Sequence, residues 1–339
     1  MKKAIVIGIV SILFMPAIAI NENMSHESFI TEGDGKTLYV GGSGPNNYTK
    51  IQDAIDNASN GDTIFVYSGI YHESIFVNKS IDIVGEYRYK TIIMAAERDA
   101  INVTVCNVNV TGFTIVSEGI KWPCAGIKLF KTRNVSILDC DIYFSPIGIY
   151  VYASDRNKIE NCDIGKNSCG VMLNLSKENS FLNCDIHHNL EEGFCLLSSH
   201  KNIIGNCNIY KNDEGVMIAG NENMVCESNI LENHNGISVS CMFNRIQKCN
   251  IYKNSFYGIL LIAAFKNMVF NNNICKNGLN AFFANAALNI WLHNYWGLPL
   301  PFPKPIFGFL VWAFREIAIP WFNFDLMPRM KPYEGNENE

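Results

Sequence analysis

The feature that most constrains this chain is a repeat of 21 to 23 residues that runs from about residue 134 onward. Most copies contain a cysteine followed two positions later by an isoleucine, as in Cys162 and Ile164 or Cys184 and Ile186. In two later copies Ser228 and Asn272 replace the cysteine. A fixed period in this range is typical of stacked-repeat architectures, in which each copy is one structural unit.

Within each copy, a glycine precedes a short stretch of alternating apolar residues, as at Gly170 and Gly215. This period of two predicts half-buried strands, and no copy contains the long helical pattern of a helical repeat. We therefore predict an all-β fold, a right-handed single-stranded parallel β-helix of about ten coils with a rise of ~4.8 Å per coil. The glycines are expected at positive-φ corners, and asparagines such as Asn189 and Asn212 are expected to stack and bond between coils.

The cysteine of each copy is expected to face the core. It lies two residues from the isoleucine, and alternate residues of a strand point to the same side. Stacked side chains are parallel, whereas a disulfide needs a Cβ separation near ~3.8 Å and a twist of ~90°. We therefore expect small, buried and mostly free thiols.

The segments that flank the repeat suggest an exported protein. Residues 1–19 read as a signal peptide, with an uncleaved membrane anchor as the alternative. Residues 37–62 are expected to form a strand and a capping helix, 63–295 the β-helix, and 296–339 a C-terminal cap or tail. The formal charge of −5 and the absence of a basic patch argue against nucleic-acid binding.

The C-terminal segment is unusually apolar. Pro305 and Pro320 enclose a stretch with helical apolar spacing, which predicts a helix that closes the end of the β-helix or folds back onto its side. The alternative is contact with a membrane surface through Trp312 and Trp321.

Three segments carry a family resemblance: residues 48–86, the sequence NYW at 294–296, and FDLMPRMKPYE at 324–334. Together with the coils they resemble the pectin-lyase-like superfamily and, more narrowly, NosD-like periplasmic proteins, over residues 37 to 334. The resemblance implies the β-helix fold and a link to copper delivery for nitrous oxide reductase. The chain departs from the NosD-like pattern between residues 297 and 320.

An acidic cluster is the first candidate site. Aligning the glycines places Glu191 with Asp213 and Glu192 with Glu214, with His187, His188 and His234 nearby. Carboxylates one strand apart can act as an acid and a base of a glycoside hydrolase, or hold Ca²⁺ for a polysaccharide lyase. The alternative is an ordinary solvated turn.

A column of soft donors is the second candidate. Two residues after successive glycines stand Tyr150, Met172, Cys195 and Met217, expected on the outer side. Thioether and thiolate donors select Cu(I), so Met172, Cys195 and Met217 are candidate copper ligands. The alternative is an apolar strip that another segment covers.

A rigid, repetitive outer face suits a repetitive ligand. We therefore expect an extracellular, cell-surface or periplasmic β-helix protein that binds an envelope or extracellular polysaccharide along its side. The candidate contacts are Tyr150, Tyr152, His187, His188 and His234. The alternatives are a polysaccharide lyase or hydrolase and a copper-delivery protein.

Overall fold

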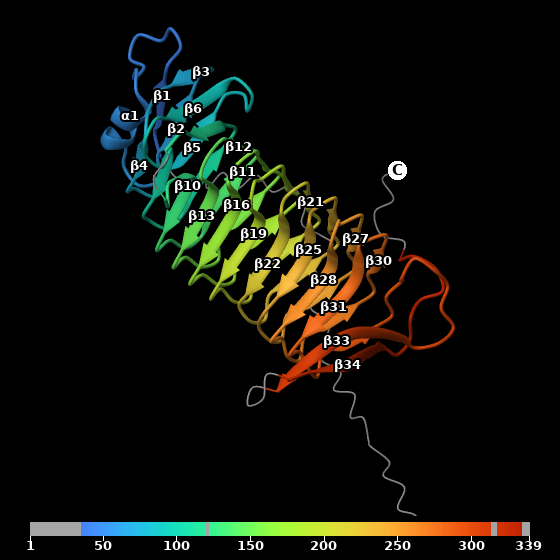
Figure 1. Ribbon diagram of the computed structural model, residues 1–339. Coiled ribbons are helices and arrows are strands. Elements are labelled where there is room, and N and C mark those ends of the chain that lie inside the picture. Colours follow the sequence, from blue (N-terminus) through green and yellow to red (C-terminus); the bar gives the residue numbers. More distant parts are fainter. Residues whose placement is uncertain (1–34, 120–121, 313–316, 334–339) are drawn as a thin grey trace, which may run out of the picture. The chain divides into compact units, whose positions relative to one another are not determined.

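The computed structural model describes residues 35–119, 122–312 and 317–333, so the predicted signal peptide lies outside the described residues. The β-helix unit, within residues 33–339, is a β-solenoid of about 12 turns with one short helix (Figure 1). The predicted fold class is therefore confirmed.

Each regular coil contributes one strand to each of three rows of parallel strands. The β18 row forms a ten-stranded sheet. Its members are β3 (Gly69–Tyr71), β6 (Thr91–Ala95), β9 (Thr114–Ser117), β12 (Asp141–Tyr143), β15 (Asp163–Gly165), β18 (Asp185–His187), β21 (Asn208–Tyr210), β24 (Asn229–Leu231), β27 (Asn250–Tyr252) and β30 (Asn273–Cys275).

The other two rows belong to one 24-stranded sheet. The β19 row comprises β4 (Ile75–Val77), β7 (Ile101–Val103), β10 (Ala125–Phe130), β13 (Ile147–Tyr152), β16 (Cys169–Asn174), β19 (Glu192–Leu197), β22 (Glu214–Ala219), β25 (Asn235–Val239), β28 (Tyr257–Ile262) and β31 (Leu279–Ala284). The β17 row comprises β1 (Thr37–Val40), β2 (Thr63–Val66), β5 (Asp82–Gly85), β8 (Val108–Thr111), β11 (Val135–Leu138), β14 (Lys158–Glu160), β17 (Ser180–Leu182), β20 (Ile203–Gly205), β23 (Met224–Cys226), β26 (Arg245–Gln247), β29 (Met268–Phe270) and β32 (Ile290–Leu292).

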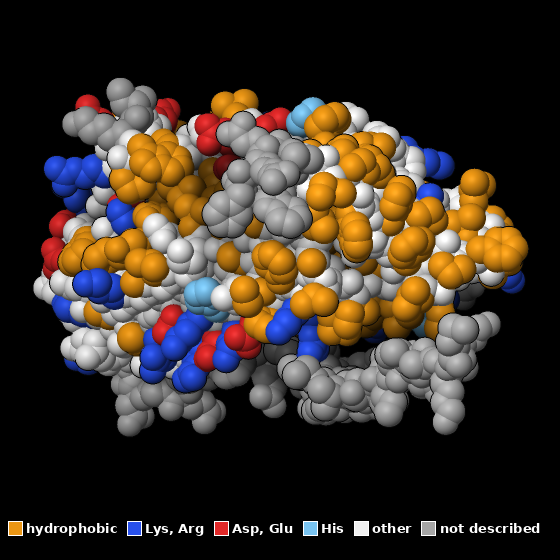
Figure 2. Space-filling view, turned by 60° about the horizontal axis from the view of Figure 1, so that its bottom comes forward, with side chains coloured by type: hydrophobic (Ala, Val, Ile, Leu, Met, Phe, Trp, Pro, Cys, Tyr) orange, Lys and Arg blue, Asp and Glu red, His pale blue; other side chains and the backbone are white. Residues whose placement is uncertain are grey.

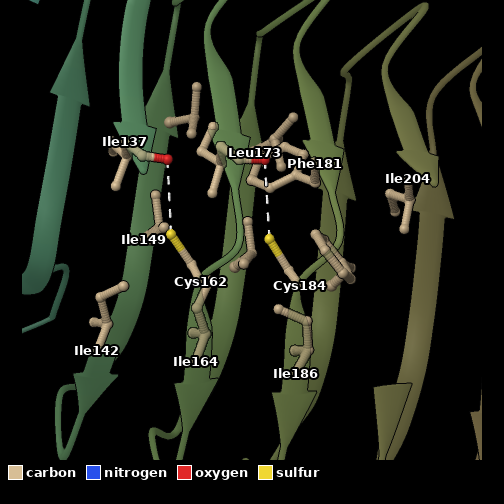
Figure 3. Packing of buried hydrophobic residues seen from close by; sticks show 14 of the residues in the cluster. Ile137, Ile142, Ile149, Cys162, Ile164, Leu173, Phe181, Cys184, Ile186 and Ile204 are labelled. Carbon is tan, nitrogen blue, oxygen red and sulfur yellow. Dashed lines mark hydrogen bonds between the residues drawn. The ribbon is translucent and has the colours of Figure 1, made fainter. Parts of the chain in front are cut away.

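The core is a column of similar layers because the register repeats from coil to coil. Ile164 pairs with Ile186, and both are fully buried. Cys162 and Cys184 lie inside as predicted, and each thiol contacts a backbone carbonyl of the preceding coil (Figure 3). No disulfide joins any of the twelve cysteines, all of which lie within the described residues.

Buried asparagines connect the coils, as the sequence predicts. Oδ1 of Asn212 accepts hydrogen bonds from the backbone N–H and the Nδ2 of Asn189, at 3.0 and 2.9 Å. Nδ2 of Asn212 in turn donates to Oδ1 of Asn233 at 3.1 Å. These ladders satisfy turn backbone groups that would otherwise be buried without partners.

The expected role of the repeat glycines is wrong. Gly170, Gly193 and Gly215 do not have positive φ; that conformation falls on other residues, including Asn161 (54°), Lys166 (56°) and His188 (54°). The glycines are needed because the coils approach closely. A Cβ on Gly193 would lie 2.7 Å from the carbonyl oxygen of Gly215.

At the N-terminal end, the amphipathic helix is α1 (Ile51–Asn57), which buries Ile51, Ala54 and Ile55. The backbone N–H groups of its first two residues, Ile51 and Gln52, donate to the carboxylate of Glu73 at 2.9 and 3.0 Å. The carboxylate therefore caps a helix that has no side-chain cap of its own.

At the C-terminal end, the predicted helix between Pro305 and Pro320 is wrong. The segment forms an antiparallel hairpin of β33 (Lys304–Trp312) and β34 (Ile317–Asp325). β33 pairs with β31 and β34 pairs with β32, so the hairpin continues two rows at once. The open strand edges of the last coil supply partners that the local sequence pattern does not reveal.

Candidate functional site

One outer face of the β-helix carries a ladder of acids and amides. We call it the Asx face; it lies on the β18 row. Nδ2 of Asn208 donates to Asp185 at 2.8 Å, and Nδ2 of Asn229 donates to Asn208 at 2.8 Å. The ladder continues through Asn250 and Asn273. The members are Asp163, Asp185, Asn208, Asn229, Asn250 and Asn273, all half-buried or exposed.

A column of rings runs beside the Asx face, two residues further along the same strands. It contains Tyr143, His187, Tyr210 and Tyr252. The rings of His187 and Tyr210 stack with centroids 5.0 Å apart and an interplanar angle of 22°. Gly165 and Leu231 interrupt the column, and a Cβ on Gly165 would lie 2.6 Å from Cε1 of His187. The ring of His187 therefore leans over the glycine.

Asp163 connects two of these rings. Nε2 of His187 lies 2.8 Å from Oδ1 of Asp163, and Tyr143 hydrogen-bonds the same carboxylate. Burial acts to raise the pKa of Asp163, but the bonds from His187 and Tyr143 outweigh it and hold that pKa below its usual value. Burial and the neighbouring Asp163 raise the pKa of Tyr143, which stays a protonated donor.

His188 extends this network to the surface. Its Nδ1 lies 2.9 Å from Nδ1 of His187, and its side chain is exposed. Partial burial, followed by the charges of His187, Lys211 and Lys166, lowers the pKa of His188. The imidazole of His188 is therefore a neutral base at neutral pH.

The predicted sugar-contact residues separate into three places. His187 and His188 lie together beside the Asx face. Tyr150 and Tyr152 lie on β13, on the outer side of the β19 row, where Tyr150 is buried. His234 is exposed on another turn, stacked on Phe256. Only the histidine pair belongs to the Asx face, and the ladder of amides beside it escaped the sequence analysis.

The predicted acidic cluster is also divided. Glu192 and Glu214 pair in register at the start of β19 and β22, half-buried, whereas Glu191 and Asp213 are exposed. Burial, and then neighbouring acids, raises the pKa of both Glu192 and Glu214. Among the described residues, Oε1 of Glu214 is buried without a hydrogen-bond partner.

The soft-donor column lies on the same strands as this carboxylate pair. Met172 pairs with Cys195 and Cys195 with Met217, so three sulfur-bearing residues occupy consecutive coils. Met172 and Cys195 are buried and Met217 is half-buried, as part of an apolar cluster on the outer side that includes Cys169. The two candidate sites of the sequence analysis are thus neighbouring columns of one surface.

Cys169 is a further sulfur ligand candidate that the sequence analysis missed. It lies one coil before Glu192, and a hydrogen bond connects the two side chains. Burial, followed by the charges of Cys195 and Glu192, raises the pKa of the Cys169 thiol; burial and nearby Glu192 and Glu191 raise that of Cys195 to about 12. Both thiols are therefore protonated at neutral pH.

The donor types decide which metal fits this surface. Among the described residues, no three His, Cys, Asp or Glu side chains converge to hold a metal ion. Ca²⁺ needs six to eight oxygen ligands, so the carboxylate pair alone does not fit it. Two thioethers and two thiols on adjacent coils fit Cu(I), and they would lose thiol protons on binding.

The C-terminal hairpin exposes many apolar side chains, among them Phe307, Trp321, Phe322 and Phe324. Figure 2 shows hydrophobic side chains gathered at the right of that face, toward the C-terminal strands of Figure 1. In the described part of the chain, no helix has the length and apolar character needed to cross a bilayer. The side chain of Trp312 lies outside the described residues.

Comparison with solved structures assigns the fold to the pectin-lyase-like β-helices. The A-module of the mannuronan C-5 epimerase AlgE4 of Azotobacter vinelandii has a TM-score of 0.63 at 14% identity, over 73% of this chain and 83% of that one. Pectate lyase Pel9A gives 0.55 at 15%, over 77% and 81%, and the polygalacturonase of Erwinia carotovora gives 0.56 at 11%, over 74% and 93%.

Comparison with protein-family models identifies the family of this chain within that fold class. Residues 106–300, more than half of the chain, match the family described as "Periplasmic copper-binding protein (NosD)", and the chain belongs to the NosD family. A search of curated protein sequences finds no match.

Proposed function

We propose that this NosD-family protein binds an extracellular polysaccharide along the Asx face. The observation that carries the proposal is a continuous ladder of amides and carboxylates on the β18 row, with the stacked rings of His187 and Tyr210 on adjacent coils beside it. Amide and carboxylate groups pair with sugar hydroxyls, and ring faces pack against sugar C–H groups.

The spacing of the face supports a polymer as the ligand. Equivalent residues recur at one strand spacing, ~4.8 Å, along the axis of the β-helix. A chain of pyranose units presents the same hydroxyl groups at regular intervals of similar length. Because Asn208, Asn229 and Asn250 are already ordered by their mutual bonds, binding would require little rearrangement of the protein.

Three of the solved structures with this fold are a mannuronan epimerase, a pectate lyase and a polygalacturonase. The likeness supports the fold, and the ladders on this chain's own surface carry the assignment of a glycan face.

The test is affinity electrophoresis of the folded protein, purified without residues 1–19, through gels containing pectate, alginate, xylan or dextran. Binding to at least one glycan is expected, and Tyr210→Ala should weaken it at least about tenfold. Tyr152→Ala is the matched control, because Tyr152 stacks on Phe130 on another face. The proposal would be contradicted if no glycan in a broad panel slowed the migration of the protein, or if both variants lost the same amount of glycan affinity.

Copper(I) binding is the second candidate, and two observations favour it: the family description and the sulfur column of Met172, Cys195 and Met217. Bound Cu(I) would be held by these sulfurs, with Cys169 beside them. Because both thiols are protonated, uptake should release protons and strengthen as pH rises.

Competition between the protein and a Cu(I)-specific chromophoric chelator measures this site. We expect one Cu(I) per chain, with affinity falling at least about tenfold in Cys195→Ser. Cys249→Ser, in the inward ladder where Ser228 already replaces cysteine in another coil, is the control. Equal Cu(I) affinity of the two variants would exclude the column.

A further inference from the structure

The residues beside the Asx face form a chain of hydrogen bonds that leads from a half-buried carboxylate to an exposed imidazole. Oδ1 of Asp163 lies 2.8 Å from Nε2 of His187, and Nδ1 of His187 lies 2.9 Å from Nδ1 of His188. Tyr143 fixes Asp163 from the preceding coil, and Tyr210 stacks on His187 from the following coil. Asp163 and His187 are therefore each held by a ring from a neighbouring coil.

The contacts determine which nitrogen carries each proton. A carboxylate only accepts, so Nε2 of His187 is the donor to Asp163. In the neutral pair, Nδ1 of His187 must then accept, and Nδ1 of His188 must donate to it. This arrangement leaves Nε2 of His188 with a free lone pair, on a side chain that is exposed to solvent.

Such a chain gives a proton that is taken up by the outer base a path inward. When Nε2 of His188 takes a proton, the Nδ1 proton can pass to His187, whose imidazolium is stabilised by the charge of Asp163. His188 has positive φ, 54°, a conformation that costs a non-glycine residue energy, and its side chain is exposed.

The groups around His188 indicate the charge of the ligand. Lys166 and Lys211 occupy the same positive-φ position one coil before and one coil after His188, and both are exposed. The nearby acids have partners: Asp163 has His187 and Tyr143, and Asp185 has Asn208. Two ammonium groups on either side of a neutral imidazole favour a ligand that brings a carboxylate to this point.

We propose that His188 is a catalytic base that abstracts the C5 proton of a uronate unit in a polysaccharide bound along the Asx face. The C5–H bond breaks, a bond forms between that proton and Nε2 of His188, and the electron pair moves into the uronate carboxylate beside Lys166 and Lys211. Return of a proton to C5 restores the sugar, so no oxidant or reductant is required. Asp163 and His187 are positioning residues, and the inference rests on the proposed glycan binding.

The experiment is solvent exchange at C5. The purified protein is incubated in D₂O with polygalacturonate or alginate, and deuterium at C5 is measured by NMR after depolymerisation, with dextran as the uncharged control. We expect deuterium in a polyuronate, and loss of at least about 100-fold of the exchange rate in His188→Asn. Asparagine is chosen because Asn161 and Asn183 hold the same positive-φ conformation elsewhere. Lys276→Asn, in the same column four coils further on, should leave the rate unchanged.

The positioning role of Asp163 can be tested by a separate measurement. Asp163→Asn should lower the exchange rate and shift its pH profile, with KM for the polymer little changed, because the imidazolium loses its counter-charge. A purely structural loss would instead appear as a lowered thermal midpoint. Binding of a polyuronate without exchange at C5 would overturn the catalytic inference and leave glycan binding intact. Absence of binding to any polysaccharide would overturn both.

Discussion

Asp325 ends the hydrogen-bond ladder that Asn294 continues: its Oδ2 lies 3.0 Å from both the backbone N and the Nδ2 of Asn294. The same oxygen accepts from Nε1 of Trp296 at 3.0 Å, and Asp325 is fully buried. Oδ1 of Asn294 accepts hydrogen bonds from the backbone N–H and the Nδ2 of Asn272, and Oδ1 of Asn272 accepts one from the backbone N–H of Cys249. The ladder that includes the inward cysteines therefore ends on a carboxylate. A carboxylate accepts without donating, and the last rung therefore needs no partner beyond it.

Asp325→Ala should lower the free energy of unfolding by about 3 kcal/mol or more, because three buried donors lose their acceptor. Asp325→Asn keeps an acceptor and should cost less. Urea unfolding followed by circular dichroism gives both values. A stability loss in Asp325→Ala no larger than in Asp325→Asn would show that the ladder end is not what fixes the hairpin.

Gly193→Ala should destabilise the β-helix by roughly 1–3 kcal/mol, because the added Cβ meets the backbone carbonyl of Gly215 at 2.7 Å. Gly205→Ala is the matched control. Its Cβ would meet the end of the flexible Leu182 side chain at 3.1 Å, which can move. Thermal unfolding of the two variants should therefore separate clearly, and equal midpoints would contradict the close approach of the coils.

Glu214→Gln should stabilise the protein at about pH 7 and have little effect at about pH 4. Burial raises the pKa of Glu214 above its value in the unfolded chain, so the folded state prefers the neutral carboxyl. The stability that the neutral Glu214 carboxyl contributes is fully present below its unfolded pKa and is lost as pH rises through its folded pKa. Glutamine stays neutral at both pH values, so the variant does not lose this stability at high pH. Urea midpoints at the two pH values test it, with exposed Glu191→Gln as control.

The thiols should give the chain an alkaline limit of stability. Burial raises the pKa of Cys195 to about 12 and that of Cys226 to about 11, against 9.0 for an ordinary thiol. Their stabilising contribution is complete below about pH 9 and disappears as pH rises through the folded values. We therefore expect the urea midpoint to fall steadily above about pH 9.

Alkylation followed by peptide mapping checks the same thiols individually. At about pH 8 the exposed Cys106 should react with iodoacetamide, whereas Cys195 and Cys226 should react only after unfolding. Rapid labelling of Cys195 in the folded protein would contradict its burial.

The sequence predicted the repeating parts of the molecule because each coil repeats the same physical problem. The inward Cys162 and Ile164, the stacked Asn189 and Asn212, and α1 at the start all follow from local spacing. The prediction failed for the C-terminal hairpin, because the apolar spacing of that segment is also that of one face of a helix. There the free edges of β31 and β32 decide the conformation, and they exist only after the coils have stacked.

The candidate sites show the same division. Spacing alone identified Met172, Cys195 and Met217 as one column and Glu192 with Glu214 as one step, and both pairings hold in the register. Only the tertiary structure joined the two into one surface, added Cys169, and separated His187 and His188 from Tyr150.

By itself, then, the sequence determined the coil, its inward and outward positions and its internal ladders, because these depend on a period that any window of the chain reveals. The tertiary structure decided what lies beside what around the coil, including the chain of bonds from Asp163 to His188. Which side chains become neighbours depends on the backbone conformation of each turn and on the orientation of its side chains. A single glycine, Gly165, leaves the space that lets His187 reach the carboxylate of the coil before it.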